Sequence, residues 1–237
     1  MITNGRRSLT GNGCEIGPLR CPAGPLQLRR DTLEVLHLQR GWMCTCVHTV
    51  GGERRIVNLY VPGDSIYLQD EVHAGYSLIA LTDVVLRASS TADSALEQQR
   101  SLSHRTLVER LLRISHGNAT QRLSYLLAEI HHRLSVNGVC HSPTFEFPVS
   151  QALVADMLAL SSVHVCRTLK QLREGGYVTL RSGYVEIHDL EALYELGEFD
   201  APTKVDVPVS SSDRVAHQPL PCTRRRRGPV RAGGALR

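Results

Sequence analysis

Side chains suited to recognising nucleic acid lie close together in residues 161–181 of this chain. Arg167 carries a planar guanidinium whose N–H groups match O6 and N7 of guanine, a pairing that discriminates between bases by about 1–3 kcal/mol. Lys170 and Arg181 carry positive charges that suit DNA phosphates, which position a protein without reading sequence. These residue types in one stretch favour nucleic-acid binding.

Two short helices joined by a tight turn are expected to position these groups. In residues 151–158 the apolar face contains Ala155, which is small enough for a second helix to cross closely. Ala159 and Leu160 make the turn, and the Ser161 hydroxyl is suited to cap the second helix by accepting from an unpaired backbone N–H. The apolar stripe of the second helix is formed by Val165, Leu169 and Leu172. This helix can therefore pack inward while its opposite face enters a DNA major groove.

A β-hairpin with a basic tip is expected to follow the helix pair. Gly175 and Gly176 end the second helix, residues 177–180 and 184–187 have strand character, and Arg181 begins the turn between them. A helix-turn-helix followed by such a hairpin is a winged helix-turn-helix, which predicts DNA binding. Taken alone, the helix pair is equally compatible with an ordinary helical hairpin inside a core.

The outward face of the second helix, its cap and the hairpin tip supply the residues that we expect to contact DNA: Ser161, Ser162, Val163, His164, Cys166, Arg167, Lys170 and Arg181. Arg167 is the expected base reader, with a phosphate contact or a surface salt bridge as the alternative. Val163 lies on the first turn beside Ser162, where it could touch a thymine methyl group or be partly buried. Ser161, His164 and Lys170 are expected phosphate contacts.

The positive charge of the chain is concentrated at its C-terminal end. The chain has 27 Lys and Arg against 23 Asp and Glu, a net charge of +4, and residues 198–237 account for all of it. Pro, Ser and Arg replace the apolar pattern there, so we expect a disordered basic tail. The arginines at 224–227 could hold DNA phosphates or keep the tail solvated, and the second interpretation is favoured.

The cysteine content and the start of the chain bear on the cellular compartment. Seven cysteines without a signal peptide indicate a reducing environment, so the protein is expected to be cytoplasmic. No stretch approaches the roughly 20 apolar residues that a membrane span needs. We therefore expect no membrane partner.

The N-terminal part of the chain predicts an all-β unit preceded by a loose arm. Residues 1–25 are rich in Gly, Pro and Arg, and residues 32–88 alternate mostly with period two. Turns are expected at Gly51 and Gly52 and at the Pro62-Gly63-Asp64 segment. The expected strands are residues 33–38, 42–47, 55–61, 76–81 and 84–88. Several short strands at close spacing predict a small barrel or β-roll.

Helical spacing begins after the predicted β-roll. Residues 91–116 carry a stripe that could pair with a second copy or pack onto the β-roll of the same chain: Leu107, Val108, Leu111, Leu112 and Ile114. Asn118 with Gln121 three residues later predicts a capping box for a further helix, which ends at Asn137. His131 and His132 are expected on its polar face, without a metal.

This order of elements resembles the Crp/Fnr family of bacterial transcription regulators over about residues 30–196. The resemblance rests on LQRGWMCTCVHTVGGERRIVNLYVPGD at 38–64, LVERLLRISHGNATQRLSYLLAEIHHRL at 107–134 and LSSVHVCRTLKQLREGGYVTLRSGYVEIHDLEAL at 160–193. Many members have an acidic residue where Val163 stands, so the familiar half-site should not be transferred to this chain.

The resemblance implies an α+β fold with an N-terminal β-roll (a cyclic-nucleotide-binding-like jelly roll), a long dimerisation helix and a C-terminal winged helix-turn-helix. The expected boundaries are an arm at 1–25, the β-roll at 26–90, the dimerisation helix at 91–116, the DNA-binding domain at 117–197 and the tail at 198–237. It also implies a homodimer that binds a palindromic promoter site on double-stranded DNA and contacts RNA polymerase. Geometry supports this, because two recognition helices about 34 Å apart read more sequence than one.

The effector sites of the family are not recognisable in this chain. Crp-like members bind cyclic nucleotide through a Gly-Glu segment followed by an arginine, and residues 65–84 contain no arginine. Fnr-like members hold an iron–sulfur cluster, but the first four cysteines here lack the family's spacing: Cys14, Cys21, Cys44 and Cys46. Nothing specific supports haem binding through His37, His48 or His73. We expect no cofactor and no metal.

The sequence therefore predicts a sequence-specific, DNA-binding transcription regulator. One alternative is a redox or gas sensor regulator that uses an iron–sulfur cluster or haem. Another is a ligand-binding or protein-docking β-roll that does not bind DNA. We do not expect an enzyme, because the sequence has no recognisable nucleophile–base arrangement, Gly-rich phosphate loop or metal-ligand spacing.

Overall fold

The computed structural model describes residues 16–26, 35–52, 54–68, 76–89, 108, 111–112 and 114–201. These residues lie in one compact unit that spans residues 1–205. The strands are β1 (Ile16–Cys21), β2 (Gly24–Pro25), β3 (Val35–Arg40), β4 (Met43–His48), β5 (Arg54–Tyr60), β6 (Ser65–Tyr67), β7 (Ser77–Ala80), β8 (Val84–Ser89), β9 (Thr144–Glu146), β10 (Val178–Arg181) and β11 (Tyr184–Ile187). The helices are α3 (Ala119–Val136), α4 (Gln151–Leu158), α5 (Ser162–Glu174) and α6 (Leu190–Gly197). The predicted α+β class is confirmed.

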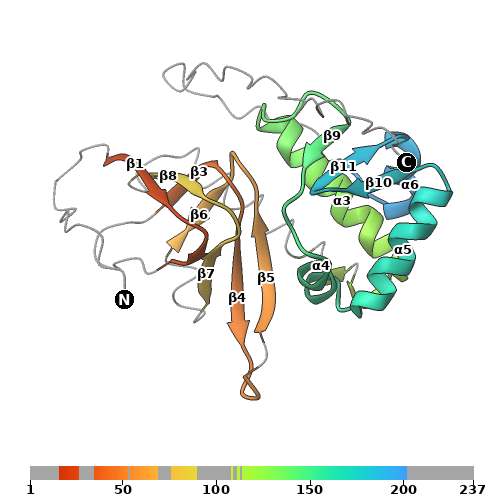
Figure 1. The fold of residues 1–237 in the computed structure, drawn as a ribbon, viewed down its shortest axis with the longest axis horizontal. Helices are drawn as coiled ribbons and strands as arrows, with labels where there is room; N and C mark the ends of the chain where they lie inside the picture. Colours follow the sequence, from red (N-terminus) through yellow and green to blue (C-terminus); the bar gives the residue numbers. More distant parts are fainter. Residues whose placement is uncertain are drawn as a thin grey trace, which may run out of the picture. The chain divides into compact units, whose positions relative to one another are not determined.

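Strands β1–β8 form the predicted β-roll from two antiparallel four-stranded sheets (Figure 1). One sheet has the order β1-β8-β3-β6, and the other has the order β2-β7-β4-β5. Leu36, Leu38 and Leu86 of the first sheet share a buried core with Met43 and Tyr60 of the second. The alternating pattern of the sequence therefore marks the strands whose inward side chains close the roll.

The prediction of a loose arm is wrong for residues 16–25. β1 pairs with β8, and β2 pairs with β7, both in antiparallel register. Each is the edge strand of its sheet, where Pro18 and Pro25 are tolerated because an edge strand leaves some N–H positions unpaired. The Gly and Pro content that suggested an arm is therefore compatible with edge strands. Residues 1–15 lie outside the described part of the chain.

Three further elements were not predicted. β6 follows the Pro62 turn and pairs with β3, β9 pairs with β11, and α6 packs on α3. Beyond α6, Phe199 is buried and makes edge-to-face ring contacts with Tyr125 at 5.4 Å and Tyr194 at 5.0 Å. The packed core thus extends past residue 197, where the tail was expected to begin.

Helix α3 begins with the predicted capping box. The Asn118 side chain accepts from the backbone N–H of Gln121 at 3.0 Å, and the Gln121 side chain accepts from the Asn118 backbone N–H at 2.9 Å. Asn137 ends the helix, as expected. The prediction for the paired histidines is wrong, because His131 is buried and His132 is half-buried. His131 packs against the ring of Phe145, a residue of the unpredicted strand β9.

No single helix among the described residues is long and apolar enough to cross a membrane. The α4–α5 pair passes the same test for a membrane span when its two helices are counted together, by length and composition only, and it is bent by 100° between them.

Candidate nucleic-acid interface

The predicted helix-turn-helix consists of α4 and α5. The side chain of Ser150 caps α4 by accepting from the backbone N–H of Leu153. Ala159 ends α4 in the left-handed conformation with φ of 50°, and the chain then turns by 100° into α5. Ser161 caps α5 by accepting from the backbone N–H of His164 at 3.2 Å. The predicted turn and cap are therefore both present.

The inward face of α5 packs against α4, as the apolar spacing predicts. Val165 and Leu172 are fully buried, and Leu169 is half-buried in the same core. Thr168 is buried as well, which the apolar pattern alone did not indicate. On α4, the small side chain of Ala155 is buried and allows the close crossing that we expected. This packing fixes which face of α5 points outward.

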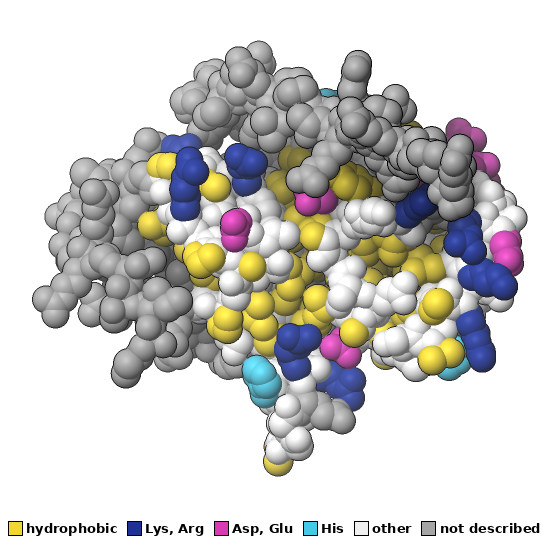
Figure 2. All heavy atoms as spheres, viewed as in Figure 1, with side chains coloured by type: hydrophobic (Ala, Val, Ile, Leu, Met, Phe, Trp, Pro, Cys, Tyr) yellow, Lys and Arg dark blue, Asp and Glu magenta, His cyan; other side chains and the backbone are white. Residues whose placement is uncertain are grey.

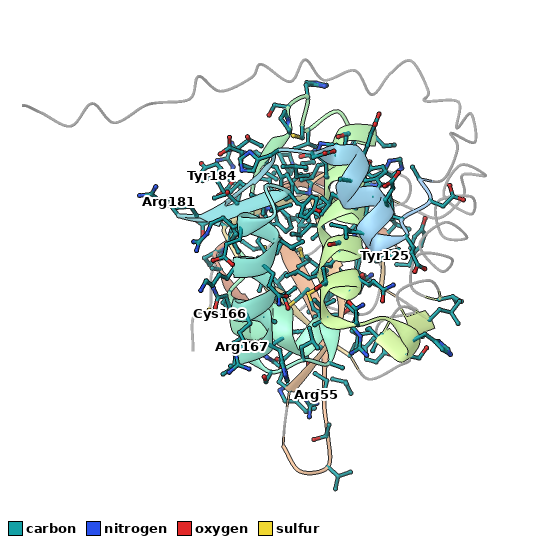
Figure 3. The ribbon with its side chains drawn as sticks, turned by 90° about the vertical axis from the view of Figure 1, so that its right-hand side faces the viewer. Arg55, Tyr125, Cys166, Arg167, Arg181 and Tyr184 are labelled. Carbon is teal, nitrogen blue, oxygen red and sulfur yellow. The ribbon has the colours of Figure 1, made fainter. Side chains whose placement is uncertain are left out.

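All the predicted contact residues of α5 and its cap are exposed: Ser161, Ser162, Val163, His164, Cys166, Arg167 and Lys170. Val163 is 58% exposed, so it is not partly buried, as its alternative assignment required. Figure 3 shows the Cys166 and Arg167 side chains on the outer side of α5. The protein's described residues therefore leave this face open.

Charges on this face are weakly engaged within the protein. The Lys170 ammonium lies 3.6 Å from the Glu174 carboxylate, an exposed i,i+4 pair of the kind that contributes about 0–1 kcal/mol. Arg167 makes no ion pair or hydrogen bond with the part of the chain that the structure describes. Its guanidinium is therefore available for an external acceptor. In contrast, the Ser161 hydroxyl is engaged in the cap and also lies 3.0 Å from His164 Nδ1.

The wing is a two-residue hairpin between β10 and β11. Ser182 and Gly183 both have positive φ, at 53° and 78°, which is the conformation that fits the twist of a tight hairpin. The turn places Arg181 opposite Tyr184, and both side chains are exposed. In Figure 3 Arg181 and Arg167 point outward on the same side of this domain, away from Tyr125 on α3. Figure 2 shows Lys and Arg side chains along the edge at which α5 lies.

One residue that the sequence reasoning missed also supports the helix pair. Arg122 Nε donates to the Gly117 carbonyl at 2.7 Å, and its Nη1 donates to the Leu158 carbonyl at 3.0 Å. Leu158 is the last residue of α4, so Arg122 satisfies a carbonyl that the helix end leaves unpaired. A contact across 36 residues has no local signal in the sequence.

Residues 121–196 match the sequence model of a Crp-like helix-turn-helix domain. The match begins within α3 and ends within α6, so it includes the helix pair and the wing. It includes the last of the three segments on which the resemblance rested, residues 160–193, and overlaps the second, residues 107–134.

The fold of the chain is that of solved Crp/Fnr regulators. FixK2 from Bradyrhizobium japonicum superposes with a TM-score of 0.64 at 18% identity, covering 81% of this chain and 100% of that protein. The regulator TTHA1359 from Thermus thermophilus gives a TM-score of 0.55 at 21% identity, covering 76% and 98%. A CooA mutant from Carboxydothermus hydrogenoformans gives 0.52 at 16% identity, covering 76% and 87%. The fold that the resemblance implied is thus confirmed. A sequence comparison with curated proteins finds no significant match.

The cysteines considered as cluster ligands do not gather into a metal site in the described part of the chain. No group of three or more His, Cys, Asp or Glu residues there could hold a metal ion. Burial, with a smaller contribution from the neighbouring Cys46, raises the pKa of the Cys44 thiol to about 11. Burial also raises the pKa of Cys46, although Arg54 opposes this shift. Cys14 lies outside the described residues.

Two of the three histidines considered for haem, His37 and His48, lie in the described part of the chain, on different strands. His37 Nδ1 lies 2.9 Å from the Ser65 hydroxyl, in the pairing of β3 with β6. His48 is exposed at the end of β4, and His73 lies outside the described residues. The positions of His37 and His48 give no geometric support to the haem alternative.

Proposed function

We propose that this protein is a sequence-specific DNA-binding transcription regulator that acts as a homodimer on palindromic promoter sites and contacts RNA polymerase. In this proposal residues 26–90 are the sensor-like β-roll, residues 91–116 the dimerisation helix and residues 117–197 the DNA-binding domain. Of residues 1–25, only those before β1 would form a flexible arm. Of residues 198–237, those after Phe199 would form a basic tail. Double-stranded DNA is the principal partner.

The open face of α5 is the observation that carries this proposal. The helix packs inward through Val165 and Leu172 and presents Arg167 to solvent. In a helix-turn-helix the second helix enters the major groove, where its N-terminal part meets the base edges. Arg167 would read guanine, Lys170 and Arg181 would hold phosphates, and Val163 would meet a thymine methyl group.

The dimer is supported by exposed apolar side chains on the helix that precedes α3. Val108, Leu111 and Leu112 are 41%, 59% and 56% exposed, and all three are helical. Packing onto the β-roll of the same chain, the alternative for this stripe, would have covered them. Ile114 is half-buried, and Leu107 lies outside the described residues. A second copy pairing along this helix would bury the stripe.

The salt dependence of DNA binding tests the proposal against a β-roll module that docks on protein. Fluorescence anisotropy with a labelled duplex, obtained by selection from random sequences, should show log K falling linearly with log salt concentration. The slope is about −0.9 for each phosphate contacted. A duplex that does not bind at low salt would contradict the proposal.

Replacing Leu111 with Glu tests the dimer. The charge would lie in the apolar stripe, so light scattering should give the mass of a monomer, and affinity for a palindromic duplex should fall at least about tenfold. The matched control is Val136→Glu, which places the same charge at a helical residue that is 55% exposed but lies outside the stripe. A dimer persisting in Leu111→Glu would contradict the assignment of this helix.

A further inference from the structure

A turn of the β-roll is held by a cluster of charged and polar groups on α3. Asp64 closes the turn after β5, where one carboxylate oxygen accepts from the Val61 backbone N–H at 2.6 Å. The same turn is bonded to β3, because Gly63 N–H donates to the Leu38 carbonyl at 2.7 Å and Leu38 N–H donates to the Asp64 carbonyl at 2.9 Å. The position of Asp64 is thus fixed by both sheets of the roll.

Arg133 of α3 meets this turn with several donors at once. Its Nη2 donates to the Asp64 carboxylate and, at 2.9 Å, to the Leu59 carbonyl of β5. Its Nη1 donates to the Glu129 carboxylate at 2.9 Å. Glu129 is buried, and the Arg133 and Asp64 side chains are only 18% and 14% exposed. Burial lowers the pKa of Arg133, but the Asp64 and Glu129 carboxylates raise it by more, so the guanidinium stays charged.

Asn137 adds a neutral contact at the end of α3. Its side-chain amide donates to the Pro62 carbonyl at 3.0 Å and lies 3.5 Å from the second Asp64 oxygen. The amide sits where a Cβ atom on residue 63 would be, and Gly63 has φ of +95°. A glycine is therefore needed here for the close approach as well as for the turn. We refer to Asp64, Arg133 and Asn137 as the turn–helix cluster.

A second contact connects the β-roll to the wing. The Trp42 ring, next to β4, meets the Phe147 ring edge-on at a centroid distance of 5.9 Å. Both side chains are buried in the core that contains α3, α4 and α5. The Phe147 backbone N–H donates to the Gly183 carbonyl at the tip of the wing, at 2.7 Å. The roll therefore holds the DNA-binding domain at α3 and, through Phe147, at the wing.

We propose that the turn–helix cluster positions the recognition helix relative to the dimer axis, so that Asp64, Arg133 and Asn137 are positioning residues for binding to two half-sites. The inference rests on the proposed function. Each recognition helix reads its own half-site, but both can do so only if each domain is held at one orientation to its own roll. Several directional hydrogen bonds resist rotation, which apolar packing alone resists less.

This assignment predicts two different responses to loss of the cluster. Affinity for a single half-site depends only on α5 and the wing and should stay unchanged. Affinity for a full palindromic site depends also on the relative orientation of the two domains, because the second contact gains from the first only when the geometry is fixed. A residue needed merely for folding would reduce both affinities together.

The experiment uses the full-length protein and three duplexes obtained by selection: the full site, one half-site, and the full site with one extra base pair between the halves. The variants are Asp64→Asn, which removes the charge that Arg133 meets, and Asn137→Ala, which keeps the backbone N–H that caps α3. Asp83→Asn is the matched control, because Asp83 is an exposed turn residue of the roll that accepts from the Ala23 backbone N–H. Thermal unfolding of every variant confirms folding.

We expect Asp64→Asn and Asn137→Ala to weaken full-site binding about tenfold and to leave half-site binding within about twofold. They should also discriminate less than the wild type against the extra base pair, which rotates one half-site by roughly a tenth of a turn. Equal losses on full and half-sites, or no loss in either variant, would overturn the inference. A wild type that binds half-sites but gains nothing from the full site would overturn the proposed dimeric function, and the inference with it.

Discussion

Helices α3 and α5 belong to the same domain and both carry charged side chains. Those of α5 are exposed, whereas those of α3 are largely buried and paired. On α5, Arg167 and Lys170 are exposed, and the pair of Lys170 with Glu174 is loose. On α3, Glu129 is buried and Arg133 bonds to two carboxylates and a backbone carbonyl. The charges on α5 are thus available to bind another molecule, whereas the charges on α3 stabilise the fold.

Substitutions of the exposed charges on α5 and of the buried charges on α3 should have different effects. A charge that is exposed and weakly paired contributes little to stability, so its removal affects only what the protein binds. A buried charge that is paired contributes through its partners, because its removal leaves them desolvated without compensation. The two helices should therefore respond differently in unfolding and in DNA binding.

The largest effect on stability is expected from Arg133→Met. The substitution leaves Asp64 and Glu129 without their guanidinium, so the free energy of unfolding should fall by about 2–4 kcal/mol, slightly less than for a fully buried pair. Urea denaturation measures this loss. Arg173→Met, which removes an exposed arginine from α5, is the control and should change the free energy by less than about 0.5 kcal/mol. Equal free energies of unfolding for the two variants would contradict the claim that α3 charges stabilise the fold and α5 charges do not.

A smaller effect is expected at the cap of α5, where stability and binding can be separated. Ser161→Ala removes the acceptor for the His164 backbone N–H and should cost about 1 kcal/mol in urea denaturation. Ser161→Asp restores the acceptor and should recover stability, but its negative charge would face DNA phosphates and weaken binding. Binding by Ser161→Asp equal to that of the wild type would argue against a phosphate near this cap.

The smallest effect is expected from pH. Burial lowers the pKa of His131, and the pKa of His132 is lowered by burial and by His131, with Glu129 opposing. The unfolded chain therefore binds more protons below about pH 6.5, so stability should decrease as the pH falls through that range. Thermal unfolding between about pH 5 and pH 8 measures the slope. His131→Gln should flatten the slope, and an unchanged slope in this variant would contradict the assignment.

The elements that the sequence predicted well are those specified by neighbouring residues. Ser161, Ala159 and the spacing of Val165 and Leu172 define α4 and α5, and the capping box of α3 is equally local. The wing needs only two short strands and a glycine. Each of these signals lies within about ten residues, which is the range over which periodicity and capping act.

The features that the sequence did not predict depend on distant contacts. Arg133 and Asp64 are 69 residues apart in the sequence, and Arg122 and Leu158 are 36 apart. No local sequence pattern therefore predicts either contact. His131 was assigned to a polar face because β9, whose Phe145 covers it, was not recognised. The fold shows which faces of the helices point inward. The side chains on the opposite faces are then the ones free to bind a partner.

Selection of bound sequences from random DNA, with the wild type and Arg167→Ala side by side, tests the central claim most directly. The wild type should enrich a palindrome with the same base, which we expect to be guanine, at one position of each half-site. Arg167→Ala should lose discrimination at that position, by about 1–3 kcal/mol per half-site, while remaining dimeric and equally stable. An identical motif from both proteins, or no enriched motif from the wild type, would contradict the account.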